Sequence, residues 1–195
     1  TEHTLSLHDA LPICLIAYYP LNDNANDESG NGNHGVLSGA AFTTVVGRAG
    51  AYFDGVDDRI EIPDATVLRR GVGSSVSMAA WVYSLSTNGV RTLLSRGRTT
   101  GAEPANYYLR FGSGVGGQQG NLQMGFWGDT INQYGNFWNE HSVSGGGMET
   151  GRWIHVAASF TFGNPGSCSL YIDGVQRASA WIVGDGEDTP ATPAA

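Results

Sequence analysis

The 195 residues contain 10 Lys and Arg against 18 Asp and Glu, for a formal net charge of −8 at pH 7. Nucleic-acid binding depends on clustered Lys and Arg, so this balance argues against a nucleic-acid partner. No apolar run approaches the roughly 18 to 20 residues of a membrane-spanning helix, and two cysteines are too few for a disulfide framework or a zinc site. An acidic surface fits a soluble extracellular module or a calcium-binding protein, and solubility alone explains it equally well.

The first residues do not resemble the rest of the chain. Residues 4–13 read TLSLHDALPI, which is typical of a translated sequencing-library adapter at the end of an assembled read. We therefore expect residues 1–13 to be a non-native segment and Cys14 to be a junction residue, so a Cys14–Cys168 disulfide is not expected. The natural start, with any secretion signal, is expected to be missing.

From Leu15 onward the chain predicts short strands joined by glycine turns, because 29 Gly and 20 aromatic residues (5 Trp, 8 Tyr and 7 Phe) accompany runs too short for helices. The runs are LIAYYPL, AYFDG, DRIEIP, SVSMAAWVY, RTLLSR, NYYLRFG, NLQMGFW, RWIHVAASFTF and SLYIDG with VQRA. Residues 75–83 have the period of two of a strand with two distinct faces. The two sets are Val76, Met78, Ala80 and Val82 against Ser75, Ser77, Ala79 and Trp81. A length of 195 residues suits one all-β domain.

Asp173 and Gly174 join the last two runs. Asp-Gly supplies the positive φ angles that a two-residue type I′ turn demands. The sequence therefore predicts a β-hairpin at this point.

Between Trp127 and Gly151 the chain has no clean period, is rich in Asn and Gly, and contains three aromatic residues, Tyr134, Phe137 and Trp138. This pattern predicts a long loop. Long loops in compact domains are more often functional than idle, because ordering them costs entropy. Residues 184–195, GDGEDTPATPAA, are typical of a linker or of a loop inside an unfinished domain.

Three stretches, read in order, carry a family resemblance: AYYPLNDNANDESGNGNHG at 17–35, YFDGVDDRIEIP at 52–63, and WIHVAASF with LYIDGVQ within 153–176. They resemble the laminin-G-like jelly-roll domains of the concanavalin A-like lectin and glucanase superfamily. The resemblance implies an all-β, two-sheet antiparallel jelly-roll sandwich over residues 14–183. It also implies a carbohydrate-binding or adhesion module, often calcium-bound and often attached to bacterial exported enzymes and surface proteins. The expected localisation is secreted or cell-surface, and the expected partner is a glycan or an extracellular protein.

The family pattern usually ends with a further strand reading like FxGxIDEVRIY, and nothing after Trp181 matches it. We therefore expect a chain truncated at both ends. An absent terminal strand would leave a sheet edge exposed.

Residues 27–35, DESGNGNHG, interleave oxygen donors with glycines, as a shell of six to eight oxygens around Ca²⁺ requires. The resemblance points the same way. The candidate ligands are Asp27 and Asn31, with carbonyls near Asn33. An Asx-rich turn whose side chains bind its own backbone explains the stretch equally well.

A second acidic cluster consists of Asp54, Asp57 and Asp58. A turn at Asp54-Gly55, with the other two aspartates solvated, is favoured over a metal site. Trp81 and Trp153 are expected to pack in the core. His155 is expected to be a strand histidine with a local hydrogen bond rather than a catalytic residue.

Sugars are bound by aromatic faces, with carboxylates, amides and Arg on the hydroxyls. Seven residues have these types. Those in the predicted loop are Asp129, Asn132, Tyr134 and Trp138, and those on neighbouring strands are Tyr107, Arg110 and Trp127. Structural packing is the competing explanation for each aromatic ring.

The rival function is a glycoside hydrolase of the same superfamily, which needs two carboxylates flanking the scissile bond. The family's E-x-D-x-E-like spacing on one strand is absent from the sequence, as are the G-x-S-x-G elbow, the Walker loop and the H-E-x-x-H motif. A non-catalytic binding module is therefore predicted. A protein-adhesion module without a sugar ligand remains an alternative.

Overall fold

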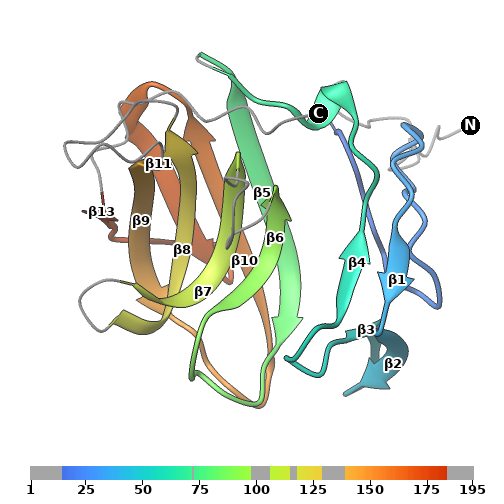
Figure 1. Ribbon diagram of the computed structural model, residues 1–195. Coiled ribbons are helices and arrows are strands. Elements are labelled where there is room, and N and C mark those ends of the chain that lie inside the picture. The colour runs from blue at the N-terminus through green and yellow to red at the C-terminus, as the bar shows by residue number, and fades with distance from the viewer. Residues whose placement is uncertain (1–14, 72, 98–105, 115–117, 129–138, 184–195) are drawn as a thin grey trace, which may run out of the picture. The chain divides into compact units, whose positions relative to one another are not determined.

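The computed structural model describes residues 15–71, 73–97, 106–114, 118–128 and 139–183 (Figure 1). The chain divides into two compact units, Thr1–Leu68 and Arg69–Ala195. Each is described by itself.

The first unit contains two small antiparallel sheets. β1 (Val36–Ser38) pairs with β4 (Arg59–Glu61), and β2 (Ala41–Val45) pairs with β3 (Arg48–Tyr52). A 3-10 turn, η1 (Thr66–Leu68), follows. Residues 15–21, predicted as a strand, are not one. The prediction was wrong because this segment bonds to a turn instead: Glu28 N–H donates to the Tyr18 carbonyl, and Tyr18 N–H donates to the Asp27 carboxylate.

The second unit is a sandwich of two antiparallel sheets, as predicted (Figure 1). The four-stranded sheet has the order β12-β11-β10-β5, and the five-stranded sheet has the order β13-β9-β8-β7-β6. The first sheet consists of β5 (Ser75–Tyr83), β10 (Trp153–Thr161), β11 (Asn164–Ile172) and β12 (Val175–Arg177). The second consists of β6 (Arg91–Arg96), β7 (Tyr107–Gly114), β8 (Gln118–Gly128), β9 (Asn139–Gly147) and β13 (Ala180–Val183).

The core lies between these two sheets. On β10 the residues alternate strictly between half-buried and buried, and β5 buries Val76 and Met78 while it exposes Ser75, Ser77 and Ala79. Phenylalanines from both sheets meet in the middle: the Phe126 ring of β8 lies 5.5 Å from that of Phe160 on β10. The period of two seen in the sequence is therefore confirmed.

The predicted hairpin is confirmed as well. Ile172 pairs with Val175, and the two residues between them, Asp173 and Gly174, have φ angles of 51° and 75°. Both signs are those of a type I′ turn.

The predicted loop from Trp127 to Gly151 is partly wrong, because β9 occupies its second half and pairs with both β8 and β13. The β9 sequence, NEHSVSGGG, contains three glycines and only one apolar residue, so its local signal for a strand is weak. Pairing on both edges supplies the backbone hydrogen bonds that define it.

Candidate binding site

One face of the five-stranded sheet points away from the core, and the alternation of β7 and β8 decides which side chains it carries. Leu109, Phe111, Leu122 and Met124 belong to the core. The intervening residues lie on the opposite face, where Arg110 pairs with Gln123 and Tyr108 pairs with Gly125 in register. This face therefore brings Tyr108, Arg110, Gln123 and Trp127 together, and we call these four residues the Tyr108 cluster.

Among the described residues, ring contacts and a hydrogen bond hold the Tyr108 cluster together. The Arg110 guanidinium carbon lies 4.3 Å from the centroid of the Tyr108 ring, within cation–π range. The Tyr108 and Trp127 ring centroids are 6.3 Å apart, with an interplanar angle of 57°. Arg110 Nε donates to Gln123 Oε1 at 2.9 Å. Tyr108 and Gln123 are fully buried, whereas Arg110 and Trp127 are half-buried, so the last two carry the accessible surface.

The side-chain amide of Gln123 is only partly hydrogen-bonded. Its buried Nε2 has no hydrogen-bond partner in the described part of the chain. Gly112 leaves room for this side chain, because a Cβ at that position would lie 2.6 Å from Gln123 Oε1. An unsatisfied buried donor costs about 1–3 kcal/mol, and such groups concentrate at sites with a further role.

Two of the strand residues predicted to bind sugar, Arg110 and Trp127, thus lie together. The third, Tyr107, lies on the core face, 5% exposed, with its ring 6.5 Å from that of Phe162. Burial raises the pKa of Tyr107, although the nearby Arg70 and Arg96 oppose the shift, and Arg70 hydrogen-bonds its side chain. The alternation that brings Arg110 to the outer face sends Tyr107 inward. Asp129, Asn132, Tyr134 and Trp138 lie outside the described residues.

The Asp27 loop, residues 27–35, forms hydrogen bonds through its side chains with its own backbone and with the backbone of residues 15–18. The buried Asp27 carboxylate accepts from the backbone N–H groups of Tyr18 and Ser29 through Oδ1, and from that of Asn33 through Oδ2. Asn31 Nδ2 donates to the Leu15 and Ile16 carbonyls. These contacts are those of an Asx-rich turn, the alternative to a calcium site that was given for this stretch from the sequence.

The same hydrogen bonds set the pKa of Asp27. Desolvation by burial raises the pKa of Asp27, but the hydrogen bonds from Ser29, Tyr18 and Asn33 outweigh it and bring the pKa down to about 2. Asn33 joins the network from both ends, since its Nδ2 donates to the Ile16 carbonyl and its own carbonyl accepts from the Tyr19 hydroxyl. The Ser29 hydroxyl also hydrogen-bonds the Asp27 carboxylate, so this carboxylate already interacts with four donor groups.

The second acidic cluster is compact. One carboxylate oxygen from each of Asp54, Asp57 and Asp58 lies within 4.8 Å of the other two. Asp54 Oδ1 accepts from Val56 N–H, which is the predicted turn, and Asp58 Oδ2 accepts from Asp54 N–H. Oxygen donors at this spacing suit Ca²⁺, although exposed carboxylates also gather without an ion.

Trp81 and Trp153 are not core residues, so that prediction was wrong. Trp81 is 50% exposed and Trp153 is half-buried, because each lies on the outward set of its strand. The ring of His155 packs edge-on against Trp81 at 5.2 Å, and the ring of Tyr83 packs against Trp153 at 5.7 Å. His155 is a strand residue, as predicted, and its N–H donates to Asp173 Oδ1.

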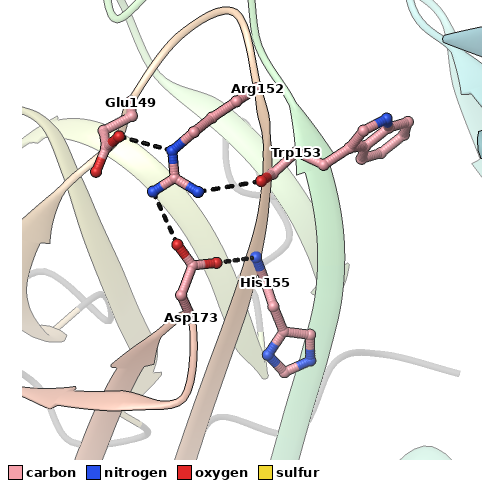
Figure 2. Close-up of polar contacts among 5 residues, drawn as sticks. All are labelled: Glu149, Arg152, Trp153, His155 and Asp173. Atoms are coloured by element: carbon pink, nitrogen blue, oxygen red, sulfur yellow. Dashed lines mark hydrogen bonds and ion pairs between the residues drawn. The ribbon is translucent and has the colours of Figure 1, made fainter. Parts of the chain in front are cut away.

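Sequence reasoning missed an ionic network around Arg152, which Figure 2 shows between the β11–β12 turn and the segment before β10. Arg152 Nε bonds Glu149 at 2.6 Å, and Arg152 Nη2 bonds Asp173 at 2.8 Å. The pKa of Glu149 falls through the hydrogen bond and charge of Arg152, and the pKa of Asp173 falls through the His155 N–H and Arg152. Glu149 and Arg152 are three residues apart, but only the fold brings Asp173 to them.

Within the described residues, no helix is long and apolar enough to cross a membrane. A laminin G family model described as "Concanavalin A-like lectin/glucanases superfamily" matches residues 54–194, about 72% of the chain. The chain belongs to this family. No curated protein and no solved structure gives a significant match.

Membership confirms the family that the three sequence stretches indicated. For this laminin G-like domain it supports, at the level of the superfamily, a module of lectin or adhesion type. The superfamily description covers both lectins and glucanases, and laminin G-like domains are generally non-catalytic.

Proposed function

We propose that the chain is a non-catalytic carbohydrate-binding or adhesion module of a secreted or cell-surface protein. The observation that carries the proposal is the Tyr108 cluster. A half-buried indole at Trp127 and the guanidinium of Arg110 both lie next to the Tyr108 ring. A buried amide at Gln123 supports the guanidinium. Sugar sites combine these three groups, with the ring on the apolar face of the pyranose and the polar groups on its hydroxyls.

The same sheet supports binding over hydrolysis. Glycoside hydrolysis requires two carboxylates about 5 to 10 Å apart. The segments RTLLSR, YYLRFGSG, QQGNLQMGFWG and AWIV, which form β6, β7, β8 and β13, contain no Asp or Glu. β9 contains a single acidic residue, Glu140, whose Cα pairs with that of Trp127. The five strands therefore lack a pair of carboxylates.

Two loop residues extend this proposal on sequence grounds, Tyr134 and Trp138, with Asp129 and Asn132 as polar neighbours. They follow directly after β8, whose last residues include Trp127.

Binding to a panel of soluble polysaccharides by affinity gel electrophoresis tests the proposal. We expect Trp127→Ala to weaken binding by about tenfold or more, since buried aromatic anchors commonly contribute 2 kcal/mol or more. Trp127→Phe should retain most of the affinity, and the double variant Tyr134→Ala/Trp138→Ala should also bind less. Leu94→Ala, which removes a side chain 38% exposed on β6 of the same sheet, is the control. Unaltered binding by Trp127→Ala would remove the Tyr108 cluster as the site.

We also propose that the domain binds Ca²⁺, as laminin G-like domains often do. The Asp54, Asp57 and Asp58 carboxylates supply one candidate site, with an oxygen from each within 4.8 Å of the other two. The Asp27 loop, with Asn31 and Asn33, is the other candidate, although Asp27 Oδ1 already accepts hydrogen bonds from two N–H groups.

If either site binds Ca²⁺, the Tm of the domain should rise when Ca²⁺ is added, because a ligand of the native state stabilises it by mass action. Asp57→Asn and Asp27→Ala identify which site is used, and a Tm indifferent to Ca²⁺ and to chelator would contradict both.

A further inference from the structure

The outer face of the four-stranded sheet has an ordered composition. Register pairs its residues across β5 and β10 as Tyr83 with Trp153, Trp81 with His155, Ala79 with Ala157, Ser77 with Ser159 and Ser75 with Thr161. These five pairs form a strip across β5 and β10. It has aromatic rings at one end, only alanine methyl groups in its middle and hydroxyl groups at its other end. On β11, Tyr171 pairs with Ala157 and Ser169 with Ser159.

Trp81 is the most accessible ring on this face, 50% exposed. The edge-on contact with His155 holds the indole from one side. Ala79 and Ala157, the next pair along the strip, have methyl side chains, which are too short to cover the Trp81 ring. Tyr171 lies two strands away, about 10 Å at the usual strand spacing, which is longer than one pyranose ring.

Charge identifies the kind of ligand that this face suits. The chain has 10 Lys and Arg and 18 Asp and Glu. None of these charged residues is on the outer set of the four strands, whose paired residues are Ser, Thr, Ala, Asn, Gln, His, Tyr and Trp. At the end of the sheet, the charges of Arg152, Glu149 and Asp173 are paired in the network described above. A face of hydroxyl, amide and aromatic groups without charge complements an uncharged polyhydroxyl compound and gives no attraction to a phosphate or an acidic peptide.

A second copy of the chain fits this face less well. Among the described residues of this outer face, Trp81 is the single large apolar side chain that is prominently exposed. A stable protein interface buries about 800 Å² on each partner and has an apolar centre. One exposed indole, with serine hydroxyls two outward positions further along the same face, matches a sugar ring better than it matches such a centre.

We propose that the outer face of the four-stranded sheet, centred on Trp81, binds the pyranose rings of a neutral polysaccharide. This inference rests on the proposed function, because it assigns the same class of ligand to a second surface. The Trp81 indole stacks on the apolar face of one ring, and Tyr171 contacts the chain further along. Ser77, Ser159 and Gln176 are within the same face to bond the sugar hydroxyls.

Affinity gel electrophoresis with four neutral polysaccharides (xylan, laminarin, galactomannan and hydroxyethyl cellulose) and two acidic ones (alginate and heparin) tests the inference. We expect Trp81→Ala to weaken retardation by a neutral polysaccharide at least tenfold and Trp81→Tyr, which keeps a ring, to weaken it less than threefold. Leu85→Ala is the matched control, because it removes a side chain 79% exposed just after the same strand. Near-UV circular dichroism and Tm establish that each variant is folded, and the Trp81→Tyr variant keeps the test decisive if Trp81→Ala is unstable.

Each remaining outcome overturns the inference in a different way. Retardation that survives Trp81→Ala but is lost in Trp127→Ala removes this face and leaves the proposed function intact. A wild-type chain retarded by none of the polysaccharides removes the proposed function together with the inference. Binding to the acidic polysaccharides alone, or a dimer in sedimentation that Trp81→Ala dissociates, assigns the face to a charged ligand or to a second copy instead.

Discussion

Several aspartates, among them Asp27, Asp54 and Asp173, accept hydrogen bonds from backbone N–H groups where the chain reverses direction. Asp27 accepts from Tyr18, Ser29 and Asn33, Asp54 accepts from Val56, and Asp173 accepts from His155. Short acidic side chains suit this task because they reach a nearby N–H group that has no partner in a ladder. Their spacing with Asn and Gly in the sequence indicated turns, but not which distant amide each carboxylate would bind.

Asp27→Asn should destabilise the first unit by about 2 kcal/mol, because hydrogen bonds to a charged acceptor contribute about 1.5–3 kcal/mol and an amide turns one acceptor into a donor. Hydrogen exchange of the Tyr18, Ser29 and Asn33 amides measures the change directly. Asp23→Asn, at an exposed position four residues earlier, is the control. Equal protection in both variants would show that the Asp27 network does not stabilise the loop.

The same residue predicts a pH dependence. The folded pKa of Asp27, about 2, lies below its ordinary value of 3.8, so the unfolded chain takes up the proton first as the pH falls. The stabilisation is therefore complete above about pH 4 and is lost progressively as the pH approaches 2. Amide protection of Ser29 and Asn33 should fall across this window in the wild type and stay level in Asp27→Asn.

At the scale of elements, local chemistry determines some turns and leaves others undetermined. Asp173-Gly174 was predictable because both residues tolerate a positive φ. The β2–β3 turn uses Val46 and Gly47, with φ of 48° and 74°, and was not predicted. A β-branched residue disfavours that conformation, so the pairing of Val45 with Arg48 has to impose it. β9 is a similar case, since its partners rather than its sequence make it a strand.

Gly174→Ala should destabilise the second unit by about 1–2 kcal/mol, the usual cost of a left-handed conformation for a residue with a Cβ. No atom lies within 4 Å of the position that the alanine methyl group would occupy, so backbone strain alone accounts for the loss. Asp173→Asn should cost less, because asparagine adopts the same φ and its side-chain oxygen still accepts from His155 N–H, while only the exposed ion pair with Arg152 is lost. Urea denaturation of both variants compares the two effects, and a larger loss for Asp173→Asn would show that the Arg152 network outweighs the turn.

At the scale of the whole molecule, the second unit depends on how its two sheets meet. Phe160 from the four-stranded sheet contacts Phe126 and Trp181 from the other, with ring centroids at 5.5 and 5.7 Å. Cys168 packs against the same core, and burial raises the pKa of its thiol to about 12. The strand periods indicated which residues share a face, but not which face is buried or which rings oppose one another.

Phe160→Ala should cost about 3–5 kcal/mol, because it removes a fully buried ring and leaves a cavity between the sheets. The midpoint of urea denaturation, followed by near-UV circular dichroism, measures the loss. Phe53→Ala, a ring 44% exposed in the first unit, should change the midpoint far less. Similar losses in the two variants would contradict the sandwich core described above.

The sequence by itself determined the fold class, the family, the two alternating faces of β5 and the β11–β12 hairpin, because each depends on residues within one strand, one turn or one family motif. The tertiary structure decided where Trp81, Trp153 and Tyr107 lie, that residues 15–21 join a turn instead of a sheet, and that Arg110 and Trp127 both lie next to the Tyr108 ring. These outcomes depend on pairings between segments far apart in the chain. A period of two separates two faces of a strand, but only the packing of one sheet on another decides which face is buried.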